Sequence, residues 1–239
     1  MKITVIIPCF NAADTIQSCL QSVVNQDAEI ELVIKDGGST DATNDIISTF
    51  QEHIAHHLIS ADKGVYDAMN QALDCATGEW VYFLGADDQL ASPSSLSELI
   101  SDAAESNDLV IGRTRNMPPR HAKVPEWYEP TWSRSIRLRN TVHHQGVAYR
   151  KNVFATYRYP IRFKVLADYH LNLKLFFDGK KASISASHVA NCGSDGLSKT
   201  FNEALYKEEW LVKKDVLSKK ELWYQPPWLM AKYLRKKIN

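Results

Sequence analysis

The chain is poor in cysteine, and its four cysteines form no Cys-x-x-Cys pair. They are widely separated, so their spacing favours neither a structural zinc site nor a disulfide framework. We therefore expect reduced thiols, which are typical of cytoplasmic proteins. The sequence also lacks an Asn-x-Ser/Thr sequon for N-glycosylation. Both absences predict a cytoplasmic location.

Long hydrophobic runs are missing as well. No stretch reaches the roughly 18 apolar residues of a membrane-spanning helix. The apolar run at residues 3–8 is too short for the core of a signal peptide and ends in Pro8, so we expect a first β-strand there. The charges cancel, because 28 basic residues stand against 28 acidic ones. This balance gives no general reason to expect a nucleic-acid partner.

Three common nucleotide and hydrolase motifs are absent. No Gly-x-Gly-x-x-Gly follows a predicted strand, which argues against a dinucleotide cofactor. No Gly-x-x-x-x-Gly-Lys occurs, which argues against a phosphate-binding loop of the nucleoside-triphosphatase type. No Gly-x-Ser-x-Gly occurs either, so a hydrolase nucleophile elbow has no support.

The residues that are present indicate an α/β protein. With 239 residues, 44% of them hydrophobic, the chain can form one large domain with or without an appendage. Apolar strand patterns alternate with amphipathic helix patterns in the first part of the chain, which predicts a mostly parallel central sheet with helices on both faces. Residues 114–140, rich in Pro, Arg and Trp, are predicted to form a long irregular connection of the kind that often binds ligands. The expected strands are 3–8, 30–36, 55–60, 80–84, 109–113, 146–150 and 182–189.

Polar side chains follow three of these strands at their carboxyl ends. They are Phe10-Asn11, Asp36 and Asp87-Asp88. In parallel α/β sheets, ligands bind at this edge. An Asp-Asp pair there suits Mg²⁺ or Mn²⁺, which takes one or two carboxylates and leaves room for water and substrate phosphates. The alternative is a surface turn with two solvated aspartates.

Six segments occur in order along the chain: VIIPCFN (5–11), KDGGSTDAT (35–43), ADKGVYDAMNQAL (61–73), TGEWVYFLGADD (77–88), HHQGVAYRKNVF (143–154) and FKVLADYHLNLKL (163–175). Together they resemble the inverting glycosyltransferases of family 2, in particular bacterial enzymes of surface-polysaccharide assembly. The resemblance covers about residues 1–200 and implies the GT-A fold of nucleotide-diphospho-sugar transferases. It also divides the chain into a catalytic domain at 1–200 and a helical extension at 201–239.

The resemblance also implies roles for single residues. Asp168 matches the general base, and Asp87 and Asp88 match the end of the family's Asp-x-Asp motif for Mn²⁺ or Mg²⁺. Gly85 stands at the first acidic position of that motif, and Ala167 replaces an acidic neighbour of the base. The expected nucleotide-sugar contacts are Pro8, Phe10, Asn11, Asp36, Asp62, Lys63, Asp67 and Asp87.

Other polar residues leave alternatives open. Asp168 is either the base or an acid favoured at a helix N-terminus. His143 and His144 precede a predicted strand, where adjacent side chains point to opposite faces, so at most one is expected to contact diphosphate or acceptor. Arg113, Arg115 and Arg120 either contact an anion or belong to a solvated loop, and residues 193–200 form either a lid or a linker.

The implied reaction moves a sugar from a nucleotide-diphospho-sugar, first of all a UDP-sugar, to an acceptor hydroxyl with inversion. A single base suffices, because a metal-neutralised diphosphate leaves without protonation. The expected context is polysaccharide, lipopolysaccharide or glycolipid biosynthesis. One alternative is a catalytically silent nucleotide-sugar-binding module, and a more distant one is a nucleotidyltransferase on a related fold.

The C-terminal segment 210–239 is basic and rich in aromatics. It has eight Lys or Arg residues against two acids, and three of the six tryptophans. This mixture is typical of a helix that lies on an anionic membrane surface. We therefore expect a saccharide or lipid-linked saccharide acceptor and a location at the inner face of the cell membrane. A helix packed on the domain, or a dimer contact, is the alternative.

Overall fold

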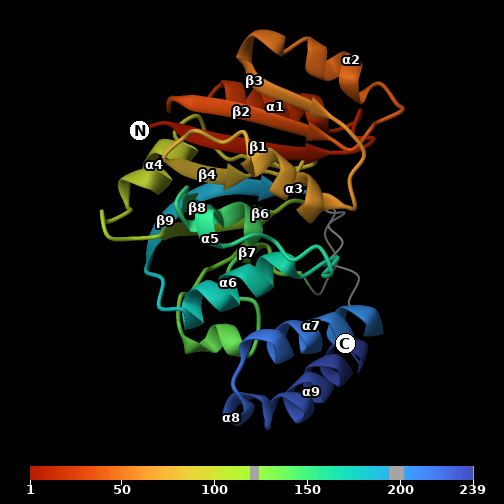
Figure 1. Cartoon of the computed structure of the whole chain (residues 1–239), viewed down its shortest axis with the longest axis vertical. Helices are drawn as coiled ribbons and strands as arrows, with labels where there is room; N and C mark the ends of the chain where they lie inside the picture. The colour runs from red at the N-terminus through yellow and green to blue at the C-terminus, as the bar shows by residue number, and fades with distance from the viewer. Residues whose placement is uncertain (119–123, 194–201, 239) are drawn as a thin grey trace.

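The computed structural model describes residues 1–118, 124–193 and 202–238. Strands and helices alternate in the first hundred residues, as predicted (Figure 1). The predicted connection at 114–140 contains the end of one strand, a second short strand and a 3-10 turn at Arg134–Arg137. The strands are β1 (Ile3–Cys9), β2 (Ile30–Asp36), β3 (Ile54–Ile59), β4 (Trp80–Phe83), β5 (Gln89–Leu90), β6 (Leu109–Asn116), β7 (Trp127–Tyr128), β8 (Val147–Arg150) and β9 (Ala182–Cys192). The helices are α1 (Ile16–Val24), α2 (Thr43–Ser48), α3 (Val65–Leu73), α4 (Ser95–Ser101), α5 (Val153–Thr156), α6 (Ala167–Phe177), α7 (Glu203–Val216), α8 (Lys219–Leu222) and α9 (Gln225–Ile238).

The N-terminal half of the sheet is parallel. Its strands lie in the order β3-β2-β1-β4, and Ile3 of β1 is in register with Ile30 on one side and Trp80 on the other. Each connection between these strands contains a helix, as parallel pairing requires. The carboxyl ends of β1, β2 and β4 therefore meet at one edge, where Asp36 and Asp87-Asp88 follow their strands.

The second half of the sheet is mixed, which refines the prediction of a mostly parallel sheet. The order continues β8-β6-β9-β5, and β8 is antiparallel to both β4 and β6. Among the described strands of this half, only β6 and β9 pair in parallel. The strand–helix alternation that predicted parallel pairing ends before residue 114, because the segment between β6 and β8 contains no α-helix among its described residues.

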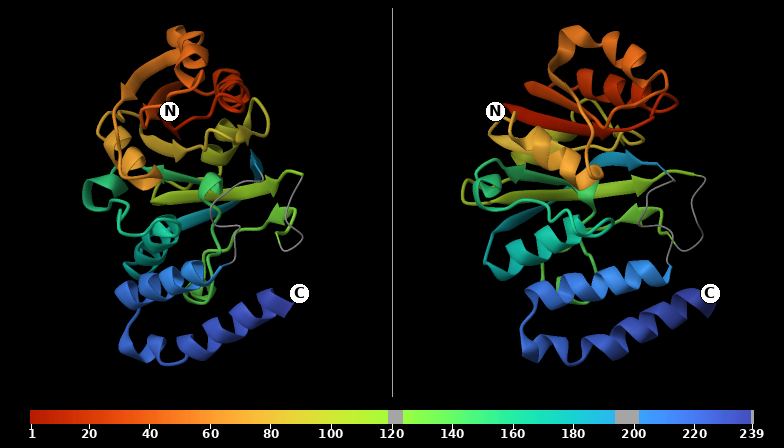
Figure 2. Two further views of the ribbon diagram at one scale, coloured as in Figure 1. Left: turned by 90° about the vertical axis from the view of Figure 1, so that its right-hand side faces the viewer. Right: turned by 45° about the vertical axis from the view of Figure 1, so that its right-hand side comes forward.

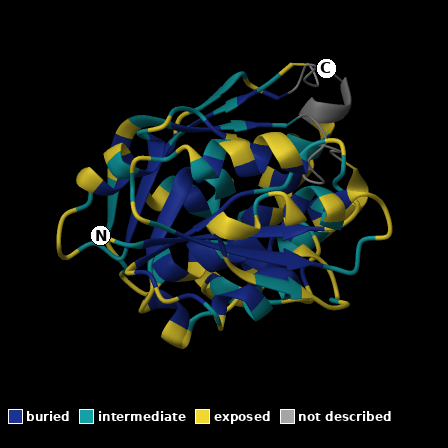
Figure 3. Ribbon diagram, turned by 90° about the horizontal axis from the view of Figure 1, so that it is seen from above, coloured by how far each residue is buried: buried dark blue, intermediate teal, exposed yellow. Residues whose placement is uncertain are grey.

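Alternation along the strands separates two hydrophobic cores, one on each face of the sheet. In β4, Val81 and Phe83 contribute to the core that contains α3 and α6, whereas Trp80 and Tyr82 contribute to the core that contains α1 and α4. The central strands are accordingly buried along their length (Figure 3). Strands covered on both faces form a rigid base for the loops at their carboxyl ends.

The C-terminal helices pack below α6 (Figure 2). Val212 of α7 and Leu217 belong to the same core as α6. Lys213 is fully buried, pairs with Glu209 at 2.9 Å and donates to the carbonyl oxygen of Leu138. No described helix is long and apolar enough to cross a membrane. The expected domain boundary at 200/201 lies outside the described residues.

Candidate active site

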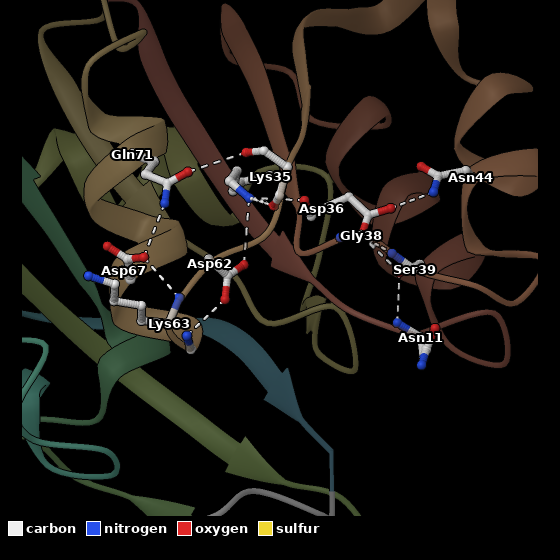
Figure 4. A network of polar contacts seen from close by, with 12 residues as sticks. Asn11, Lys35, Asp36, Gly38, Ser39, Asn44, Asp62, Lys63, Asp67 and Gln71 are labelled. Atoms are coloured by element: carbon white, nitrogen blue, oxygen red, sulfur yellow. Dashed lines mark hydrogen bonds and ion pairs between the residues drawn. The ribbon is translucent and has the colours of Figure 1, made fainter.

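One large cavity, of about 960 Å³, opens at the carboxyl edge of the parallel strands. The loops after β1 and β4 form one side of it, and the start of α6 and parts of α7 and α9 form the other. Eight residues predicted from the sequence line this cavity: Pro8, Phe10, Asn11, Asp87, Asp88, His143, His144 and Asp168. Four others, Asp36, Asp62, Lys63 and Asp67, do not line it and form a polar network beside it (Figure 4).

Asp87 and Asp88 lie in the loop after β4, and their carboxylates converge on one point. A Cβ atom on Gly85 would lie 2.5 Å from Asp88 Oδ2 and 2.9 Å from Asp87 Oδ1, so this point stays free only with glycine at position 85. Asp88 is buried, and its Oδ1 accepts a hydrogen bond of 2.8 Å from the backbone N–H of Gly193. The loop at residue 193 thus holds this carboxylate in place.

Two converging carboxylates fit a hard divalent cation such as Mn²⁺ or Mg²⁺. Among the described residues, no group of three or more His, Cys, Asp and Glu side chains suits a metal. A cation here therefore depends on water and substrate phosphates for its remaining ligands, as Mg²⁺ sites commonly do.

Asp36 organises the loop that follows β2. Its Oδ1 accepts hydrogen bonds from the backbone of Gly38 and from both the backbone and the hydroxyl of Ser39, and its Oδ2 accepts one from Asn44. Figure 4 shows this carboxylate turned toward Ser39 and Asn44. Asp36 is completely buried. Its carboxylate can contact a nucleotide base only if this loop rearranges, and without such a change backbone groups of the loop would have to make the contact instead.

The loop after β1 is tied to the same turn. The backbone N–H of Asn11 donates to Ser39 Oγ at 2.8 Å, and Asn11 Oδ1 accepts from the backbone of Thr40 at 2.9 Å. Asn11 has a positive φ of 49°, which Asn tolerates better than most residues. Its neighbour Phe10 is 62% exposed, so its ring is available to a ligand.

The remaining network residues fix the start of α3. Asp67 Oδ2 accepts from the backbone N–H of Lys63 at 2.9 Å, and Asp62 Oδ1 accepts from Gly64 at 2.8 Å. Asp62 also lies 3.5 Å from the ammonium group of the buried Lys35. In this arrangement Asp62 and Asp67 shape the loop, while the exposed side chain of Lys63 remains free to reach a bound anion.

Asp168, the second residue of α6, faces the cavity from the side opposite β1. Only 9% of it is exposed, and burial raises its pKa from 3.8 to about 6, against the opposing effect of hydrogen bonds. One of these comes from the hydroxyl of Tyr66, at 3.1 Å. A carboxylate with such a pKa is ionised at neutral pH and is a better proton acceptor than an exposed aspartate.

Both histidines contribute to the cavity wall, and which of them contacts diphosphate or acceptor stays a prediction. His144 begins a 3-10 turn (His144–Gly146), whereas the backbone of His143 is extended. Both ring nitrogens of His144 are buried without a hydrogen-bond partner among the described residues, and burial lowers its pKa to about 3. Its ring stacks on Phe83, with centroids 5.5 Å apart. His144 is therefore neutral, whereas His143 lies 3.9 Å from Cys192 Sγ through Nδ1.

A family model named Glycosyl transferase family 2 matches residues 4–161, which include the carboxylates that follow β2 and β4. The chain belongs to glycosyl transferase family 2. A PGL/p-HBAD biosynthesis glycosyltransferase of Mycobacterium bovis (strain BCG / Pasteur 1173P2) is 36% identical over 184 residues, which are 72% of this chain and 69% of the relative.

Solved structures establish the fold of this family 2 member. S. aureus TarS 1-349, crystallised in complex with UDP-GlcNAc, matches with a TM-score of 0.72 at 24% identity, over 98% of this chain and 72% of that one. The mannosyltransferase PcManGT from Pyrobaculum calidifontis, in complex with GDP-Man and Mn²⁺, matches with a TM-score of 0.66 at 20% identity, over 97% and 68%. In another structure of TarS 1-349, this chain spans 64% of the neighbour's length. The GT-A fold predicted from the sequence is confirmed.

The sequence did not reveal all residues around Asp168. Tyr66 was not singled out, although it directly precedes Asp67 in a segment that matches the family. Leu205, Tyr206, Glu209 and Lys232 of the C-terminal helices also line the cavity, and no local motif marked them.

Two arginines of β6, Arg113 and Arg115, are engaged with their own hairpin. Arg113 pairs with Glu129 at 2.6 Å and Arg115 with Glu126 at 2.8 Å, and both guanidinium groups lie over the Trp127 ring. This favours the structural alternative for both. Arg120 and residues 194–200 lie outside the described part of the chain.

Proposed function

We propose that this glycosyltransferase moves a sugar from a nucleotide-diphospho-sugar to an acceptor hydroxyl with inversion, and that a UDP-sugar is the donor to test first. One observation carries the proposal: Asp87 and Asp88, converging after β4, and the buried Asp168 on α6 line the same cavity. An enzyme of this type needs carboxylates that hold a metal ion beside the diphosphate, and it needs a separate carboxylate that accepts the proton of the acceptor hydroxyl.

The donor side of the proposed site is the wall formed by β1, β2 and β4. Pro8, Phe10 and Asn11 are placed to contact the nucleotide, with Asp36 supporting the loop beside them. Asp62, Lys63 and Asp67 are proposed to act near the ribose, diphosphate and sugar. Asp88, together with Asp87, is proposed to hold Mn²⁺ or Mg²⁺, which would neutralise the charge of the departing diphosphate. The Mn²⁺ complex of PcManGT supports this assignment for the fold.

Asp168 is the proposed general base. The acceptor oxygen attacks the anomeric carbon from the face opposite the nucleoside diphosphate, the bond from that carbon to the diphosphate oxygen breaks, and the hydroxyl proton moves to the Asp168 carboxylate. The raised pKa of Asp168 supports this role, because the group is still ionised above pH 6 and binds a proton readily. The neutral His144 and its neighbour His143 are proposed to contact the diphosphate or acceptor.

The acceptor is proposed to be a saccharide or a lipid-linked saccharide, in polysaccharide, lipopolysaccharide or glycolipid biosynthesis. The name of the mycobacterial relative, a PGL/p-HBAD biosynthesis glycosyltransferase, supports a biosynthetic acceptor of this kind. We propose further that the enzyme works in the cytoplasm at the inner face of the cell membrane, which it contacts through residues 210–239. Several exposed apolar side chains of this segment support that contact: Leu211, Trp223, Trp228, Met230 and Leu234.

A panel of UDP-, GDP- and TDP-sugars tests the proposal. Thermal unfolding and calorimetry in Mn²⁺ should identify one nucleotide that raises the unfolding temperature, because a ligand of the folded state stabilises it. The matching sugar nucleotide should then be hydrolysed or transferred, and Asp87→Ala and Asp88→Ala should each lower this turnover. Binding without turnover of any donor would instead favour the catalytically silent module. Turnover that survives both substitutions would contradict the proposal.

A further inference from the structure

The clearest unassigned feature lies where helix α7 meets the first turn of α6. The side chain of Glu208, in α7, reaches the segment that leads into α6, and its Oε1 accepts hydrogen bonds from the backbone N–H groups of Val165 at 2.8 Å and Leu166 at 2.7 Å. N–H groups at the start of a helix have no partner within the helix. Glu208 therefore supplies, from a distant part of the chain, an acceptor that the local sequence does not provide.

The same short segment is held from the opposite side by α3. The hydroxyl of Tyr66 lies 2.8 Å from the carbonyl oxygen of Val165 and 3.1 Å from Asp168 Oδ1. Val165 is thus bound through its N–H by Glu208 and through its C=O by Tyr66. Two elements outside α6 fix the backbone three residues before the proposed base.

Glu208 does not itself border the cavity, although its neighbours Leu205, Tyr206 and Glu209 do. It therefore has no direct contact with substrate in this arrangement. Its two hydrogen bonds are charge-assisted, and a negative group at a helix N-terminus is further favoured by the helix dipole. Both effects stabilise the backbone conformation that directs Asp168 into the cavity.

We propose that Glu208 is a positioning residue for the base, and that helix α7 of the C-terminal extension is consequently a component of the catalytic centre. The proposal rests on the function assigned above to Asp168. It assigns to the extension a task in the chemical step that is independent of any membrane contact.

Two substitutions of Glu208 test this role. Glu208→Ala removes the acceptor, whereas Glu208→Gln keeps a side-chain oxygen that can accept from the same N–H groups. In full-length protein with Mn²⁺ and the UDP-sugar that shows turnover, Glu208→Ala should lower kcat about tenfold or more, since small misplacements of a catalytic group are costly. The donor KM and the Kd for UDP should stay within about twofold, because the donor wall is untouched. Glu208→Gln should recover most of kcat.

Glu203→Ala is the matched control. Glu203 lies in the same helix, is largely exposed and pairs with Lys207 at 2.7 Å, so its loss tests α7 without touching the start of α6. It should leave kcat unchanged. Wild-type kcat in Glu208→Ala would overturn the proposal, as would an equal loss of kcat in Glu208→Gln, or a loss of UDP affinity that parallels the loss of kcat.

Hydrogen–deuterium exchange separates this proposal from the function on which it rests. The amides of residues 165–168 should exchange faster in Glu208→Ala than in wild type and return to slow exchange in Glu208→Gln. If the wild type releases no nucleoside diphosphate from any donor of the panel, the proposed function fails, whatever the exchange rates are. If the wild type is active and exchange at 165–168 is unchanged in Glu208→Ala, the role of Glu208 is overturned alone.

Discussion

The hydroxyl of Tyr66 lies between two groups of another element, 3.1 Å from Asp168 Oδ1 and 2.8 Å from the carbonyl oxygen of Val165. Tyr66 belongs to α3, on the proposed donor side of the cavity, and Asp168 to α6, on the proposed acceptor side. A single phenol therefore joins the two halves of the proposed active site. It also links the proton affinity of the base to the position of α3.

We expect Tyr66→Phe to shift the pH dependence of turnover. Burial raises the pKa of Asp168 to about 6, and the hydrogen bond from Tyr66 is one of the effects that limit this rise. Without the hydroxyl, the pKa should rise further, and the acidic limb of the kcat/KM profile should move to higher pH. Turnover should fall several-fold near pH 6 and approach the wild-type value near pH 8, where the carboxylate is ionised in both proteins.

Tyr157→Phe is a suitable control for this experiment. It removes another hydroxyl that donates to an aspartate, Asp178, at 2.8 Å on the exposed side of the molecule. Its pH profile should match that of the wild type. An unchanged profile in Tyr66→Phe would show that this hydrogen bond does not influence the base.

Asp168→Asn should abolish most transfer and at the same time stabilise the fold at alkaline pH. The pKa of Asp168 rises from 3.8 to about 6 on folding, so the folded state binds more protons than the unfolded state between these values. Stability therefore falls as the pH rises through this window, and above it the ionised group costs about 3 kcal/mol. The neutral Asn avoids this cost, and turnover should drop by about 10²–10⁴-fold.

Denaturant unfolding at pH 5 and pH 8 measures this prediction. The gain in unfolding free energy of Asp168→Asn over wild type should be larger at pH 8 than at pH 5. Asp74→Asn, at an exposed position paired with Arg158, should show no comparable gain. A loss of stability of Asp168→Asn at pH 8 would contradict the assigned effect of burial.

The sequence predicted those site residues whose placement follows from a single strand. The apolar run in β4 predicts a buried strand, and the parallel topology then places the following Asp87 and Asp88 at the ligand-binding edge. The same reasoning predicted Phe10 and Asn11 after β1. In each case a local pattern and one topological rule are sufficient.

Contacts between distant segments were not predictable in this way. Tyr66 and Asp168 are 102 residues apart, and their contact depends on how α3 and α6 pack on the same face of the sheet. Glu208 meets Val165 only because α7 folds back beneath α6, and a basic aromatic segment gave no reason to expect that. The 3-10 turn at His144–Gly146 was not predicted either, and side chains in such a turn do not alternate as they do in a strand.

Gly85→Ala should impair metal-dependent activity without removing any ligand. The added Cβ would lie 2.5 Å from Asp88 Oδ2, which is closer than real contacts allow, so the carboxylates must move apart. We expect a loss of Mn²⁺-dependent thermal stabilisation and at least about a tenfold drop in turnover, as for Asp88→Asn. Ala103→Ser, near the end of an unrelated helix, is the control. Gly179→Ala would not serve as one, because Gly179 has a positive φ of 80°, where any side chain adds strain. Wild-type Mn²⁺ dependence in Gly85→Ala would exclude a cation between Asp87 and Asp88.

The last prediction concerns the outer surface of the C-terminal helices. Trp223, Met230 and Leu234 are exposed and follow one another at spacings of seven and four residues, so Met230 and Leu234 share one face of α9. Exposed Lys214 lies in α7, and exposed Lys219 and Lys220 lie in α8. Aromatic and aliphatic side chains with neighbouring lysines favour an anionic bilayer over water.

Replacing Trp223, Met230 and Leu234 together by Ser should therefore weaken binding to vesicles of phosphatidylcholine and phosphatidylglycerol at least about tenfold, since each buried apolar side chain contributes roughly 1.5–3 kcal/mol when fully transferred. Co-sedimentation measures the effect, and high salt should weaken wild-type binding because it screens the lysines.

Ile59→Ser with Ile184→Ser is the control, since both positions are exposed outside the extension. Vesicle binding that is equal in the triple variant and the wild type would refute the membrane contact. A dimer that dissociates in the triple variant, seen by sedimentation velocity, would instead assign this face to a second copy of the chain.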